Sequence, residues 1–114
     1  MEAPFLVSSR GDFTVIKFQT PSLMNAGELD RIRKALSALV DDDHPGRILL
    51  DFTPVKFLSS QAIGMIVNLE KTTTIGGGEL VLCGLTPQLL QLLRVTRMDQ
   101  VFTIVKDQKE ATGV

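Results

Sequence analysis

A chain of 114 residues, 44% of them hydrophobic, can form one compact domain with one core and is too short for two. Its 12 basic and 13 acidic residues give a net charge of −1 without a basic stripe, which argues against nucleic-acid binding. No apolar run approaches the roughly 18 residues of a membrane span, and the first residues lack a signal-peptide pattern. Because its single cysteine, Cys83, cannot form an internal disulfide, we expect a cytoplasmic location.

The N-terminal part of the sequence predicts a β-hairpin followed by a helix. Residues 5–8 and 13–18 have the pattern of strands, and the residues between them have turn chemistry. Residues 20–22 interrupt this pattern, and from about residue 24 to residue 42 the period becomes helical. The apolar positions of this helix share one face, which we expect to pack on a sheet: Leu29, Ile32, Leu36, Leu39 and Val40.

The central residues predict a buried strand and a second helix. Proline and glycine in the turn at residues 41–46 end the first helix, and the near-continuous apolar run at 47–52 indicates a strand covered on both faces. A loop at 53–58 leads to a helix that begins at Ser59 or Ser60 and stops at the glycines 76–78.

The C-terminal residues continue the alternation of strands and helices. Residues 79–83 predict a strand, and Thr86 with Pro87 opens a third helix. Residues 101–105 predict a last strand, and residues 105–114 a polar tail. We therefore predict a single α/β domain over residues 1–114, with a mixed sheet of four to five strands and helices packed on it.

The second helix has one polar face. With Ser59 as its N-cap, its apolar residues fill a broad arc, and four other residues lie together on the opposite side: Gln61, Gly64, Asn68 and Lys71. Gly64 costs such a helix about 1 kcal/mol relative to alanine. Either a partner approaches the backbone at this point, or Gly64 packs under a loop of its own domain.

Three stretches of the sequence resemble the STAS family of bacterial anti-sigma factor antagonists. Residues 51–64, DFTPVKFLSSQAIG, are similar to the family's first block. That block consists of an aspartate, a short loop and the sequence Phe-hydrophobic-Asp-Ser-Ser-Gly-Leu-Gly. Residues 77–87, GGELVLCGLTP, resemble a second block, Gly-Gly-Glu, three hydrophobic residues, Cys-x-x-Ser-Pro, and residues 92–102 resemble a third. The likeness covers about residues 46–105 in sequence and the first 45 residues only in the order of elements.

The resemblance implies a binding protein and not an enzyme. Such proteins bind an anti-sigma factor, often also a serine kinase of the ATPase fold, and thereby free a sigma factor and regulate transcription. Phosphorylation of a serine at the start of the second helix ends the binding. A phosphoryl group adds about −1.5 to −2 charges, which the N-terminus of a helix tolerates, so the domain is expected to stay folded while its docking surface changes.

This sequence departs from the family pattern at the modified position. Ser59 stands at the family's aspartate, Ser60 at its first serine, and Gln61, which cannot accept a phosphoryl group, at the usual phosphoacceptor. The family's Gly-Glu-Leu-Asp after the second strand is also missing, and residues 20–23 occupy that region. Either Ser60 or Ser59 is the acceptor, or the partner is bound without this control.

Other candidate sites have simpler interpretations. Asp51 ends a strand like a receiver's phosphoacceptor, but Ser8 and Ser9 stand where receivers hold acidic residues, so we expect Asp51 to cap the following loop. The glycines 76–78 precede a strand and lack the lysine of a phosphate loop. Residues 41–44, three aspartates and the only histidine, predict a solvated turn and not a cation site. We expect Cys83 to be a buried structural cysteine.

The leading hypothesis is therefore an anti-sigma factor antagonist without a cofactor, a metal or a catalytic residue. It would dock its partner through one set of residues at the second helix: Ser59, Ser60, Gln61, Gly64, Asn68 and Lys71. The alternative is a STAS-type scaffold or ligand-sensing subunit of a larger signalling or transport complex. The sequence leaves open whether the chain forms a homodimer.

Overall fold

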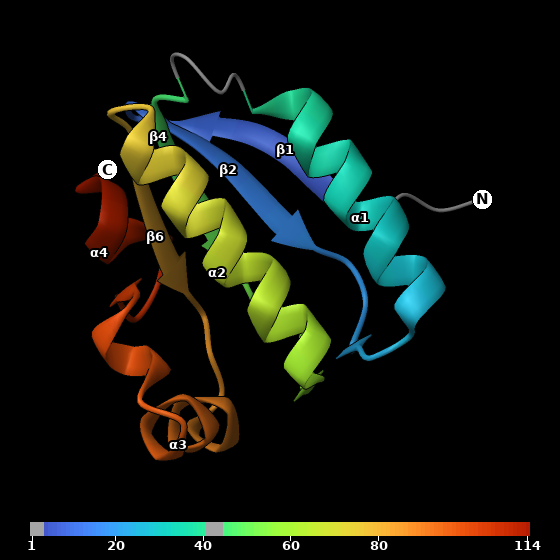
Figure 1. The fold of residues 1–114 in the computed structure, drawn as a ribbon. Helices are drawn as coiled ribbons and strands as arrows, with labels where there is room; N and C mark the ends of the chain where they lie inside the picture. The colour runs from blue at the N-terminus through green and yellow to red at the C-terminus, as the bar shows by residue number, and fades with distance from the viewer. Residues whose placement is uncertain (1–3, 41–44) are drawn as a thin grey trace.

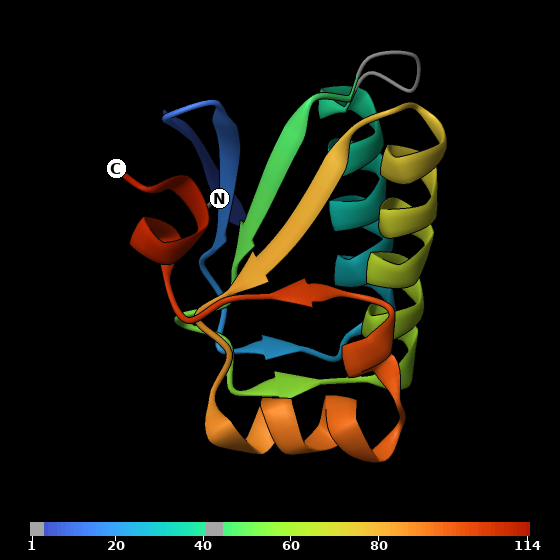
Figure 2. The same ribbon diagram turned by 90° about the vertical axis from the view of Figure 1, so that its left-hand side faces the viewer.

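The computed structural model describes residues 4–40 and 45–114 as a five-stranded mixed sheet with helices on both faces. Its strands lie in the order β1-β2-β4-β6-β7. Helices α1 and α2 cover one face, and the short C-terminal helix α4 lies against the other (Figures 1 and 2). The predicted α/β architecture is confirmed.

The sheet begins with the predicted hairpin. Strands β1 (Phe5–Arg10) and β2 (Phe13–Phe18) pair antiparallel, with Phe5 opposite Phe18. The remaining neighbours pair parallel: β4 (Arg47–Asp51), β6 (Glu79–Cys83) and β7 (Thr103–Ile104). Parallel strands need crossover connections, which α1, α2 and α3 supply. The last strand is shorter than the predicted 101–105, because the one-turn 3-10 helix Met98–Gln100 precedes it.

A second, two-stranded sheet lies at one end of the molecule. Strands β3 (Ser22–Leu23) and β5 (Phe57–Leu58) pair parallel, with Leu23 opposite Leu58. The sequence predicted only an interruption and a loop at these places. A strand of two residues is too short to give a period-2 pattern, so its pairing is visible only in three dimensions.

Helix α1 (Ala26–Leu39) is shorter than the predicted 24–42, because Asn25 caps its first turn by accepting a hydrogen bond from the backbone N–H of Glu28 at 3.0 Å. Leu29, Ile32 and Leu36 are buried as predicted. Leu39 is 42% exposed, so the prediction that it belongs to the packed face is wrong. The helix ends at this residue, and Val40, in extended backbone, is buried in its place.

The core has a large part and a small part, one on each face of the sheet. The large cluster joins α1, α2 and α3 (Pro87–Val95) to the sheet and contains Phe18 and Phe52, whose ring centroids are 5.0 Å apart. The small cluster on the opposite face consists of Phe13, Val15, Leu49, Val81 and Cys83, with the α4 residue Ala111 packed against it. The central strands are thus buried on both faces, which the apolar run at 47–52 predicted for β4.

The C-terminal residues 105–114, predicted as a polar tail, contain a short helix. Residues Gln108–Thr112 form α4, which Asp107 caps, and Arg10 donates two hydrogen bonds to the carbonyl oxygen of Val114. A helix of five residues cannot show apolar periodicity, so its contacts with distant parts of the chain could not be predicted.

Asp51 connects α4 to the sheet. Asp51 is 4% exposed; one oxygen of its carboxylate accepts a hydrogen bond from the Thr53 backbone N–H at 2.9 Å, and the other accepts one from Gln108 Nε2 at 2.7 Å. The prediction that Asp51 caps the following loop is confirmed. Burial by itself raises the pKa of Asp51, but the hydrogen bonds from Thr53 and Gln108 outweigh it, and the net pKa is lowered.

Replacement of Gln108 by alanine should therefore destabilise the protein in a pH-dependent way. Loss of a hydrogen bond to a buried carboxylate costs roughly 1.5–3 kcal/mol at neutral pH. Because the folded-state pKa of Asp51 is lowered, this stabilisation is present above the unfolded pKa of 3.8 and is lost as the pH falls through the folded value. Urea unfolding of both proteins at pH 7 and pH 3 measures the difference. If Gln108→Ala lowered the free energy of unfolding by the same amount at both pH values, the hydrogen bond to the ionised Asp51 would be contradicted. Gln100→Ala, at an exposed glutamine, is the control.

Candidate functional site

The start of helix α2 (Ser60–Ile75) is held in place by the small sheet. The backbone N–H of Ser59 donates to the carbonyl of Leu23 at 3.1 Å, immediately after the β3–β5 pairing. The Ser59 side chain then accepts a hydrogen bond from the backbone N–H of Ala62 at 3.1 Å. The prediction of Ser59 as the N-cap is confirmed, and this cap sets which residues of α2 face inward.

Helix α2 has a buried face and an exposed polar face. Ala62, Met65, Ile66 and Thr73 are buried against the domain. Five of its exposed residues form what we call the α2 polar face: Ser60, Gln61, Gly64, Asn68 and Lys71. All five lie where the sequence predicted an outward surface, and Ser59 beside them is half-buried.

Gly64 is open to solvent. A Cβ atom built at this residue meets no atom of its surroundings within 4 Å. At Gly84 the same atom would lie 2.5 Å from Thr53 Oγ1, and the backbone angle φ is +74°, so that glycine is required by the fold. The interpretation that Gly64 packs under a loop of its own domain is therefore wrong.

The two serines at the start of α2 differ in accessibility. The Ser59 hydroxyl oxygen accepts the capping hydrogen bond, and its residue is half-buried. Ser60 is the first residue of the helix and is exposed. An incoming molecule therefore reaches the Ser60 hydroxyl without displacing the cap, whereas it reaches Ser59 only by disturbing it.

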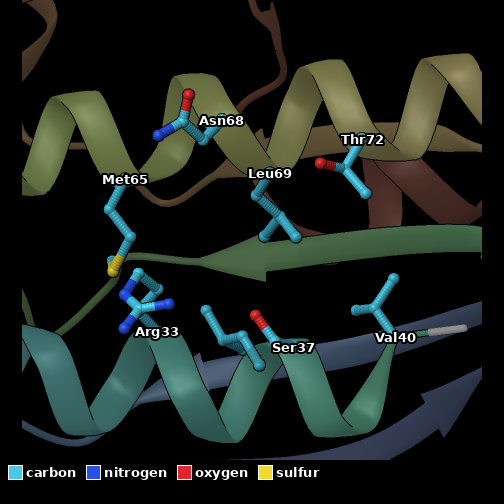
Figure 3. Close-up of a pocket in the computed structure, with 8 residues that line it drawn as sticks. Arg33, Ser37, Val40, Met65, Asn68, Leu69 and Thr72 are labelled. Atoms are coloured by element: carbon cyan, nitrogen blue, oxygen red, sulfur yellow. The ribbon is translucent and has the colours of Figure 1, made fainter. Parts of the chain in front are cut away.

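A groove runs between α1 and α2 beside the polar face. Figure 3 shows Met65 and Leu69 of α2 pointing toward α1, with Arg33 and Val40 on the other side. This cavity has a volume of about 300 Å³, and a second one of about 320 Å³ reaches Gln61 and Gly64. Both cavities share Arg33, Met65 and Asn68, so the groove continues to the polar face.

A third cavity, of about 560 Å³, lies where β5 meets α3 at the end of the molecule drawn lowest in Figures 1 and 2. Its lining is mostly apolar, and Phe57 and Met24 on it are 59% and 54% exposed. Lys56 is the one charged residue among those that line it. The sequence did not predict this cavity, because its walls come from three separate segments of the chain.

The other candidate positions have structural roles. Cys83 is buried, as predicted, and burial raises the pKa of its thiol to about 12, so it is protonated at neutral pH. Gly76 and Gly77 end α2 before β6. Within residues 4–40 and 45–114 no group of His, Cys, Asp and Glu is arranged to hold a metal ion, and the predicted turn at 41–44 lies outside the described residues. Among those same residues no helix has the length and apolar character needed to cross a bilayer.

The fold and the exposed, capped α2 define a small α/β domain of the STAS class. The sequence profile of the STAS domain family matches residues 6–111, and the chain belongs to this family. The assignment confirms the resemblance carried by residues 51–64 and 77–87.

Individual relatives support this assignment. The chain is 24% identical over 91 residues to BtrV of Bordetella bronchiseptica, whose name assigns it to the anti-sigma factor antagonists, covering 80% of this chain and 78% of BtrV. It is similar to the structure of an anti-sigma-factor antagonist (STAS) domain protein from Planctomyces limnophilus, with 25% identity, 96% of each chain covered and a TM-score of 0.83. The murine anion transporter Slc26a9 shares the fold at 16% identity and a TM-score of 0.72, over 91% of this chain and 18% of the transporter.

Replacement of Gly64 by alanine should stabilise the domain. The added methyl group meets no neighbour, so the gain equals the difference in helix propensity, about 1 kcal/mol. Urea unfolding at pH 7 measures it. Gly84→Ala is the matched control and should destabilise, because its methyl group meets Thr53 and Asp51. A destabilised Gly64→Ala protein would contradict the open surface that the structure has at this position.

Proposed function

We propose that this chain is an anti-sigma factor antagonist, which binds an anti-sigma factor and thereby releases a sigma factor for transcription. The observation that carries the proposal is the solvent-open α2 polar face around Gly64. A helix glycine that serves no packing in its own domain reduces stability, and a partner that approaches the backbone at this point accounts for it. The name of the relative BtrV points in the same direction.

The polar face suits contact with another protein. Gln61 and Asn68 offer both donors and acceptors, and Lys71 adds a positive charge one turn further along the helix. Ser59 and Ser60 lie at the end of this face, where the first backbone N–H groups of the helix point outward. The groove between α1 and α2 gives the partner a place for apolar side chains beside these polar contacts.

Ser60 is the proposed phosphoacceptor if the partner is also a serine kinase. Its hydroxyl is exposed, whereas Ser59 is half-buried and holds the cap, and Gln61 cannot be phosphorylated. A phosphoryl group in the first turn lies at the positive end of the helix dipole, so α2 remains folded. The added charge and volume would oppose docking on the adjoining polar face.

A second candidate function is that of a STAS subunit in a larger signalling or transport complex. The occurrence of this fold within the transporter Slc26a9 supports this second candidate. The two functions differ in the partner they require: an anti-sigma factor of the ATPase fold in the first case, and several STAS proteins or a transporter in the second.

Pull-down of the tagged full chain from its native cells should recover an anti-sigma factor, and Gly64→Arg should lose it. An arginine side chain on the open helix surface blocks close approach and leaves the fold intact, since the position is exposed. The matched control is Ile75→Arg at the far end of the same helix, where the side chain is 87% exposed. Equal recovery with both variants would contradict docking through the α2 polar face, and recovery of a multi-STAS complex would favour the second function.

Incubation with the recovered kinase and ATP should modify Ser60. Mass spectrometry of the peptide that contains residues 57–71 locates the phosphoryl group, and Ser60→Ala should abolish it. Ser59→Ala should remain a substrate, although loss of the cap costs about 1 kcal/mol of stability. An unmodified peptide, with the two proteins still associated, would contradict control by phosphorylation and leave the docking proposal intact.

A further inference from the structure

The apolar cavity at the end of the molecule is next to the proposed docking face. Phe57 and Leu58 line the cavity, and the next residue in the chain is the helix cap Ser59. Lys56 also lines it, and the rest of its lining comes from Met24, from the α3 cap Thr86 and from the first turns of α3. A partner that covers the start of α2 would therefore extend directly over this cavity.

Two large apolar side chains at this cavity are exposed to solvent. Phe57 is 59% exposed and Met24 is 54% exposed, although both lie beside the largest cavity described above. The β3–β5 pairing holds Phe57 in place, with its backbone N–H donating to Pro21 at 3.2 Å. An exposed aromatic side chain on a rigid backbone beside an apolar hollow is typical of the central contacts of protein interfaces.

The charge of this end of the molecule indicates the chemistry of the partner. Lys56 is the only charged residue among those that line the cavity, and two more basic residues, Arg94 and Arg97, follow its lining residues along the chain. All three basic residues are exposed, and within residues 4–40 and 45–114 none of them forms an ion pair. Asp30 on the neighbouring α1 is already paired with Arg33 and Lys34.

We propose that the partner inserts an apolar side chain, flanked by acidic residues, into the cavity between β5 and α3, with Phe57 and Lys56 as the main contacts. This inference rests on the proposed function, because it assigns the occupant of the cavity to the protein that docks on α2. Complementary charge favours an acidic partner surface at Lys56, and burial of Phe57 and Met24 supplies the apolar contact.

The test uses two photo-crosslinking residues, introduced separately into the full chain in its native cells. p-Benzoylphenylalanine replaces Phe57 at the cavity in one protein and Gln61 on the α2 polar face in the other. We expect both positions to capture the same protein, identified by mass spectrometry as an anti-sigma factor. Capture of an anti-sigma factor at Gln61 but not at Phe57 would overturn only the proposal that the partner fills the cavity. Capture of no anti-sigma factor at either position would overturn both the proposed function and this inference. Capture of a second copy of the chain at Phe57 would also overturn this inference.

Binding to the captured and purified protein then measures the contributions of the two residues. Phe57→Ala and Lys56→Glu should each weaken binding by about tenfold or more. Ile75→Ala and Lys109→Glu, at exposed positions away from the cavity, should change it little. The association rate of the wild-type chain should fall as NaCl rises from about 50 to 500 mM, and Lys56→Glu should reduce that dependence. Unchanged affinity for Phe57→Ala, or association that salt does not affect, would contradict the proposal.

Discussion

The hydrogen bond from the Ser59 backbone to Leu23, together with the β3–β5 pairing, determines where helix α2 begins. Each residue of a helix is rotated by about 100° from the one before it, so a start one residue earlier or later would rotate the polar face by roughly a quarter turn. The solvent exposure of Gln61, Gly64 and Asn68 therefore depends on a two-residue strand pair that lies outside the main sheet. The same pair carries Phe57 and forms part of the apolar cavity. One local constraint thus positions both surfaces to which we assign partner binding.

The residues of α2 that stabilise the fold are largely distinct from those to which we assign partner binding. Ala62 and Ile66 are almost completely buried, and replacing them affects the core. Gly64, Asn68 and Lys71 are exposed, and substitutions there are expected to change the free energy of folding little, apart from the propensity gain at Gly64. Such a division lets a helix present different contact residues to a partner while the fold is retained. It also explains how Gln61 can occupy the usual acceptor position of the family without a structural consequence, since its side chain contacts solvent.

The sequence predicted the elements that have a clear period or a cap, and it missed those defined by contacts between distant residues. The Ser59 cap, the Thr86-Pro87 start of α3 and the doubly covered β4 follow from local residue chemistry, and all three are present. Strands β3 and β5 and helix α4 are too short to produce a pattern. Helix α4 is held by the hydrogen bond between Gln108 and Asp51, which are 57 residues apart in the chain. The cavity beside Phe57 was missed for the same reason, because segments from three parts of the chain form its walls.

The position of Ser60 relative to the two proposed contact surfaces explains why a single modification could act on both. Ser60 is the first residue of α2, so it stands between the polar face further along the helix and the cavity that begins at Leu58. Lys56 at the cavity and Arg94 and Arg97 further along the chain are positively charged, and a phosphoryl group of about −1.5 to −2 charges would offset half or more of that charge. An acidic partner would then lose its electrostatic attraction at the cavity and meet added bulk at the helix. The helix itself tolerates the anion, because the partial positive charge of its first backbone N–H groups lies at the same place. We therefore expect phosphorylation of Ser60 to reduce binding without unfolding the domain.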